Sequence, residues 1–272
     1  MAKFAVLKGM KLRATKVNSC GLPIDGPGNY VVTDGFVSVK LSPNMRDAKD
    51  IEQENAQGKV CITDRTPPER KWYDLELALC GVDTHLVTML NGWPQEVDYD
   101  GNPVGYRDRK SVESDFGIAL EVWTGGKSDD DCPAPSGDDI FANPTSGKSY
   151  GYLLTWGTEW TLGDLEIKAD VADFTLSGIS FAGPQWGRGP WNVVPIDSSG
   201  TAGRLITPTD DDQHYVFQRT SIAPPDATPG SEGCELDIAG TFTDPDFYFG
   251  GSGPGEDAAD VAPDQPGCTV NP

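Results

Sequence analysis

One short pattern in the sequence is typical of a catalytic serine. Residues 147–151 read Gly-Lys-Ser-Tyr-Gly, matching the pattern in which a sharp strand-to-helix turn exposes a nucleophile, here Ser149, to a histidine base. The residues that follow form an apolar run at 152–156 without helical periodicity, and His85 and His214 are the only histidines. A short motif without its structural context is weak evidence. We therefore expect no enzymatic activity and no catalytic residue.

Other short patterns suggest ligand sites but are incomplete. Two Gly-Lys-Ser tripeptides, at 126–128 and 147–149, lack the first glycine of the phosphate-binding loop. Residues 98–102, Asp-Tyr-Asp-Gly-Asn, resemble the start of a calcium loop, but Arg109 stands where the loop requires a glutamate. A surface turn is the better interpretation of 98–102. Acidic runs at 129–131 and 210–212 are more typical of solvated loops, so we expect no metal and no cofactor.

Tryptophan provides the one remaining candidate for ligand binding. Trp186 and Trp191 lie in a turn-rich segment, and flat aromatic faces can stack on sugar rings. Tryptophan is more often a core or interface residue. The sequence leaves open, as the alternative function, a carbohydrate-binding β-sandwich module on a virion or cell surface.

The composition favours a soluble protein made of short strands. The chain has 272 residues with 32 Gly and 22 Pro, which suits strands joined by turns. Its formal net charge of −21 opposes adhesion to nucleic acid or to anionic membranes. The N-terminus lacks the apolar core of a secretory signal, and no stretch approaches the about 18 apolar residues of a membrane span. The six cysteines are scattered without a CxxC pair, so no zinc site is predicted.

Alternation of apolar and polar residues predicts the elements. It marks strands buried on one side, and other apolar runs complete the set: 36–41, 74–80, 118–122, 150–156, 165–169, 173–179 and 214–219. One short helix is expected at 84–90, with Asp83 as its N-cap and Asn91-Gly92 as its end. These elements predict an all-β fold with one flanking helix.

Two segments are expected to lie outside regular structure. Residues 42–59 are polar and charged between two apolar strands, which predicts a long extended loop rather than a tight hairpin. Such a loop is either solvated or an arm that contacts another subunit. After Ile222 the chain is rich in Pro, Gly and acidic residues. We therefore predict a β domain at 1–222 and an appendage at 223–272.

Residues 33–92 resemble the N-terminal half of major tail proteins from siphophages that infect actinobacteria. The resemblance lies in the strand TDGFVSVKLSPN, the segment ENAQGKVCITD and the strand–helix unit WYDLELALCGVDTHLVTMLNG. It specifically covers about a quarter of the chain. The resemblance implies a β-sandwich or barrel-like domain that assembles into six-fold rings. The inner sheets would join into one continuous barrel, and the rings would stack into the tube for genome ejection.

The resemblance also implies partners and candidate site residues. The partners would be other copies of the chain, the tape measure protein, the tail terminator and the baseplate and distal tail proteins, in a virion tail assembled in the bacterial cytoplasm. DNA would pass through without specific binding, and no membrane would be involved. Residues 42–59 would reach an adjacent ring through Asn44, Arg46, Asp47, Lys49, Glu52 and Glu54. Charge adds a separate hypothesis: an acidic wall would repel phosphates, and we expect Glu76, Glu121 and Glu166 to line the lumen.

Overall fold

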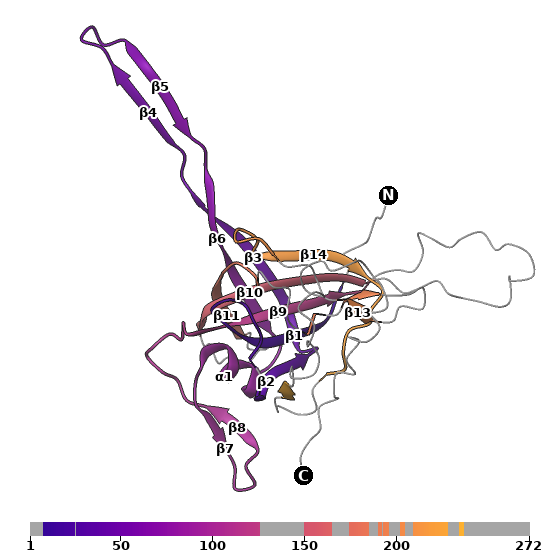
Figure 1. The fold of residues 1–272 in the computed structure, drawn as a ribbon. Helices are drawn as coiled ribbons and strands as arrows, with labels where there is room; N and C mark the ends of the chain where they lie inside the picture. The colour runs from indigo at the N-terminus through magenta and orange to yellow at the C-terminus, as the bar shows by residue number, and fades with distance from the viewer. Residues whose placement is uncertain are drawn as a thin grey trace, which may run out of the picture.

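The computed structural model describes residues 8–24, 26–125, 150–164, 174–184, 190–191, 193–195, 202–204, 209–227 and 234–236. In this part of the chain the regular structure is β except for one helix, α1 (Thr84–Asn91), as Figure 1 shows. The all-β prediction is confirmed for these residues. No helix among them is long and apolar enough to cross a membrane.

Nine of the described strands form one antiparallel sheet. Its path is β15-β2-β1-β9-β10-β11-β6-β3, and β14 pairs with the first half of β10 beside β11. The sheet ends at β15 and β3 and does not close into a barrel within the described residues. The strands are β1 (Gly9–Asn18), β2 (Gly26–Thr33), β3 (Phe36–Arg46), β6 (Glu69–Leu79), β9 (Phe116–Thr124), β10 (Tyr150–Leu162), β11 (Phe174–Ser180), β14 (Tyr215–Thr220) and β15 (Cys234–Leu236).

These strands confirm the predicted ones except at 165–169, which lies outside the described residues. β15 bears on the predicted domain division, because Cys234 pairs with Tyr30 of β2. Part of the segment 223–272 therefore extends the main sheet. The rest of that segment, apart from residues 223–227, lies outside the described residues, and the division at 222 stays a prediction.

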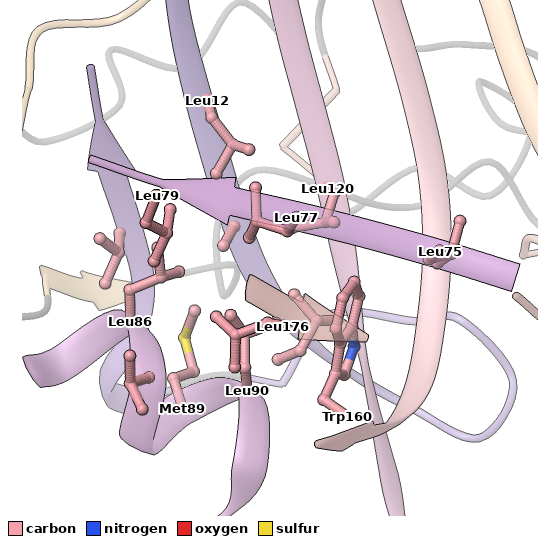
Figure 2. Packing of buried hydrophobic residues seen from close by; sticks show 14 of the residues in the cluster. Leu12, Leu75, Leu77, Leu79, Leu86, Met89, Leu90, Leu120, Trp160 and Leu176 are labelled. Carbon is pink, nitrogen blue, oxygen red and sulfur yellow. The ribbon is translucent and has the colours of Figure 1, made fainter. Parts of the chain in front are cut away.

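The larger core lies between one face of the sheet and α1. Alternation along β6 places Leu75, Leu77 and Leu79 in this core, which Figure 2 shows together with side chains of the helix. Leu86 and Leu90 project from α1 toward the same cluster. The predicted helix ends are confirmed: Asp83 accepts a hydrogen bond from the backbone N–H of Leu86 at 3.0 Å, and Gly92 has a φ of 65°.

A second core covers the opposite face of β9 and β10. It contains Trp123, Tyr152, Leu154 and Trp156, and the segment around Trp191 lies over it. β9 is therefore buried on both faces, and the prediction that it is buried on one side is wrong. The sequence contains a signal for burial of the second face. Trp123, a large apolar residue, lies on the same face of the strand as Glu121, which the prediction treated as the solvent face.

The predicted loop at 42–59 is also wrong. Its residues continue β3 and form β4 (Lys49–Glu54), which pairs with β5 (Val60–Thr66) in a hairpin. The turn is built by Asn55, whose side-chain oxygen accepts hydrogen bonds from the backbone of Gln57 at 2.9 Å and of Lys59 at 3.0 Å. Gly58 supplies the left-handed backbone that the turn needs, with a φ of 72°. The strands escaped notice because a ribbon exposed on both faces has no apolar alternation.

Two smaller hairpins lie outside the main sheet. β7 (Gln95–Val97) pairs with β8 (Pro103–Tyr106), and β12 (Val194–Pro195) pairs with β13 (Ala202–Arg204). The turn at 98–102 joins β7 to β8, which confirms the surface-turn interpretation of that motif. The side-chain oxygen Oδ1 of Asp98 accepts hydrogen bonds from the backbone of Asp100 at 2.9 Å and of Asn102 at 2.8 Å.

Candidate assembly site

A two-stranded ribbon projects from the main sheet as an arm (Figure 1). It consists of β4, the turn at 55–59 and β5, and it continues from the paired ends of β3 and β6, where Arg46 lies opposite Glu69. At about 3.3 Å per residue, the chain from Arg46 to Asn55 spans roughly 30 Å. All residues of β4 are exposed. The arm therefore buries little of its own surface and is available to another molecule.

The two faces of β4 differ in charge. Alternation places Asp50, Glu52 and Glu54 on one face, and Ile51 with its neighbours Lys49 and Gln53 on the other. Arg65 lies opposite Asp50, with its Nε 3.4 Å from the carboxylate. Glu52 and Glu54 form no ion pair with any described residue. This acidic face is thus free to meet a basic partner.

The predicted assembly residues are spread over three parts of this structure. Asn44 and Arg46 lie on β3, and Asp47 lies between β3 and β4. Lys49, Glu52 and Glu54 lie on β4. Asn44 is tied to the body, because its side-chain amide donates a hydrogen bond to Asp74 at 3.3 Å. The sequence missed β5, the returning half of the arm. The β-branched residues Val60, Ile62 and Thr63 and the turn from Asn55 to Gly58 were the available signals.

The three candidate lumen residues have different positions. The side chain of Glu76 is 45% exposed, and its carboxylate lies 3.4 Å from the amine of Lys40. Glu121 is fully buried, so its carboxylate is not available to line a lumen. Glu166 lies outside the described residues. Glu76 alone among them is a solvent-facing acid in the described part of the chain.

Glu121 belongs to a buried polar network that crosses adjacent strands. It forms an ion pair with its cross-strand partner Arg13 and accepts a hydrogen bond from the Tyr152 hydroxyl at 2.7 Å. Burial lowers the pKa of Arg13, but Glu121 outweighs this effect and the net pKa is raised. Burial, followed by the negative charge of Glu121, raises the pKa of Tyr152 well above its ordinary value. The network therefore holds a charged pair beside a neutral phenol.

The same network fixes the segment that covers the second core. Arg13 donates a hydrogen bond to the backbone oxygen of Pro190 at 2.8 Å, and the Trp191 ring packs edge-on against Trp156 with 5.8 Å between centroids. Trp191 is fully buried. It is therefore not available for stacking on a sugar. Trp186, its predicted companion, lies outside the described residues.

A serine–histidine contact occurs away from the predicted motif. The hydroxyl of Ser180 lies 2.7 Å from Nδ1 of His214 and accepts a hydrogen bond from the backbone of Tyr73 at 2.8 Å. Burial, followed by the positive charge of Arg70, lowers the pKa of His214. Because Ser180 is 4% exposed, a substrate cannot reach it in this arrangement, and the contact ties three strands together. Ser149 lies outside the described residues.

An open groove of about 340 Å³ lies beside the root of the arm. Its lining includes Asp74, Glu76 and Glu159, and Glu159 has a φ of 55° at the bulge of β10. No group of three acidic, histidine or cysteine side chains in the described residues is arranged to hold a metal ion. The groove is thus an acidic surface without a metal-binding geometry.

A second projecting element was missed by the sequence reasoning. The hairpin of β7 and β8 exposes apolar side chains, with Val97, Tyr99 and Val104 at 55%, 95% and 61% exposure. It is followed by the exposed basic residues Arg107, Arg109 and Lys110, with Asp108 between the first two. Apolar residues on both sides of the turn motif at 98–102 were the available signal.

A comparison of the chain with protein-family models gave no match, and a search of curated proteins gave none either.

Proposed function

We propose that this chain is the major tail protein of a long-tailed bacteriophage of actinobacteria, a structural subunit and not an enzyme. Copies form hexameric rings whose sheets join into a continuous barrel, and the rings stack into the tube for genome ejection. The observation that carries the proposal is the arm, a charged ribbon with a reach of roughly 30 Å and no core of its own. The sequence resemblance at 33–92 spans both strands of the arm and the strands β3 and β6 from which it projects.

The exposed apolar side chains of the arm favour a contact with another subunit. The arm has no core of its own, and it exposes Ile51 and Val60 at 45% and 48%. A contact with another subunit would bury these side chains and stabilise the ribbon. An arm that contacts a second copy at a different surface generates an open stack when the rotation between copies does not close a ring, and an open stack is the geometry of a tube.

The sheet supports the same proposal. β3 and β15 are the ends of the strand order in the described residues, and open edges tend to pair with other strands. Closure of a ring would pair such edges between neighbouring copies. The tape measure protein, the tail terminator and the baseplate and distal tail proteins are the further partners proposed. DNA would pass without specific binding, because a wall with acids such as Glu76 repels phosphates.

Electron microscopy of the purified full chain tests the proposal. Negative-stain images across a range of concentration and salt should show rings or hollow tubes. A variant in which residues 49–66 are replaced by a two-residue Asn-Gly turn keeps the pairing of Arg46 with Glu69 and should form rings at most. Persistent monomers of the unmodified chain, even when mixed with a tail initiation complex, would contradict the proposal. Long tubes of the shortened variant would contradict the role of the arm.

A further inference from the structure

The hairpin of β7 and β8 presents an apolar surface on a well-fixed support. Its tip is held by the Asp98 hydrogen bonds, and the hydrogen bond from the Asn102 side chain, at 3.1 Å, lowers the pKa of Asp98. Its base is held by the Trp93 and Tyr106 rings, whose centroids are 5.5 Å apart. Tyr99 is thus 95% exposed on an ordered turn. Exposed apolar groups of this kind mark interaction sites, and tyrosine is enriched among the residues that dominate binding.

Basic residues follow this hairpin in the sequence. Arg107, Arg109 and Lys110 are exposed immediately after β8. Arg107 is engaged in an ion pair with Glu96 of β7. Arg109 and Lys110 form no ion pair with any described residue. We call the exposed side chains of Val97, Tyr99 and Val104, together with Arg109 and Lys110, the acceptor surface.

The arm has the complementary chemistry. Its unpaired acids, Glu52 and Glu54, match the two free basic residues of the acceptor surface in number and in sign. Val60, which lies opposite Glu54 in the strand pairing, is 48% exposed and provides a match for the exposed valines and tyrosine. Residues 107–110 contain three basic residues and one acid, Asp108, so this segment carries a net positive charge in a protein whose net charge is −21. Charge complementarity of this type selects a partner and its register.

The arm and the acceptor surface of one copy cannot contact each other. Figure 1 shows the arm extending away from the body in one direction and the β7–β8 hairpin projecting from the far side. We therefore propose that the arm of one copy docks on the acceptor surface of a second copy. This contact uses two different patches, so each copy offers a free arm and a free acceptor, and the contact extends an open stack when its rotation does not close a ring. The inference rests on the proposed function and identifies the surface that receives the arm.

Charge reversal on each side tests the contact in the full chain. The variants E52K/E54K and R109E/K110E each place like charges opposite one another, so neither should form tubes under conditions in which the unmodified chain does. The combined variant E52K/E54K/R109E/K110E restores opposite charges and should form tubes again. D211K/D226K, which adds the same positive charge at exposed acids elsewhere, should assemble normally. Y99S should raise the critical concentration for assembly by about tenfold or more.

The outcomes separate the two proposals. Failure of the unmodified chain to assemble, also with an initiation complex, refutes the proposed function and this contact with it. Normal tubes from either double charge reversal refute the contact alone. So does failure of the combined variant, provided that circular dichroism shows it as folded as the unmodified chain. If each double variant loses tube formation and the combined variant regains it, the contact is established.

Discussion

Replacing Glu121 by glutamine should destabilise the fold more than any exposed charge change. The side chains of Arg13 and Glu121 are 5% and 0% exposed, so the variant E121Q leaves the guanidinium buried without a negative charge. Breaking a buried ion pair in this way costs about 3–5 kcal/mol. The stability of a typical domain is about 5–15 kcal/mol, so a large share of it would be lost. The exposed Lys40–Glu76 pair offers a matched control, and E76Q should change stability by less than about 1 kcal/mol.

The cost should arise from the unpaired charge and not from the loss of favourable attraction. The triple variant R13M/E121L/Y152F removes the charges and the Tyr152 hydroxyl together, leaving an apolar layer of similar volume. It should therefore be more stable than E121Q, since apolar replacement of a buried pair is often neutral or stabilising. Urea unfolding followed by tryptophan fluorescence measures all variants. A value for E121Q within about 1 kcal/mol of the unmodified chain, or a triple variant less stable than E121Q, would refute the reasoning.

Two further predictions concern the second core and its surroundings. A Cβ at Gly183 would overlap the Trp156 ring and the Thr209 hydroxyl, so G183A should lower the unfolding free energy by about 1–3 kcal/mol, whereas G81A, with open space around it, should not. The lowered pKa of His214 means that the unfolded chain binds a proton more readily below about pH 6.5. Stability should therefore fall as the pH drops from about 7 to about 5, and less steeply in H214N; equal slopes for both proteins would exclude this contribution.

The sequence predicted those elements that have one apolar face and clear end signals. Leu75, Leu77 and Leu79 alternate with polar residues on β6, and Asp83 and Gly92 delimit α1, so local patterns were sufficient there. Glu121 was misplaced because a charged residue on an alternating strand normally faces solvent. Its burial depends on Arg13, which is 108 positions away in the sequence and meets it only through strand pairing.

The site was predicted in part for the same reason. Position and charge marked residues 42–59 as a projecting segment, but pairing with 60–66 is a property of two strands together, and β4 alternates in charge and not in apolar residues. The acceptor surface escaped prediction because exposure of Tyr99 is set by the Asp98 turn and by the packing of Trp93 on Tyr106. The residue type of Tyr99 alone does not determine whether its side chain is buried or exposed.

The difference between a loop and a ribbon changes the energetics of docking. A flexible loop loses about 1–2 kcal/mol of conformational entropy for each residue that becomes ordered on binding. The arm is already ordered by the pairing from Lys49 opposite Thr66 to Gln53 opposite Ile62. This pairing continues the register of β3 and β6, in which Leu75 and Leu77 belong to the core. Docking at the tip therefore costs little conformational entropy. The docked arm is continuous with β3 and β6, which belong to the main sheet.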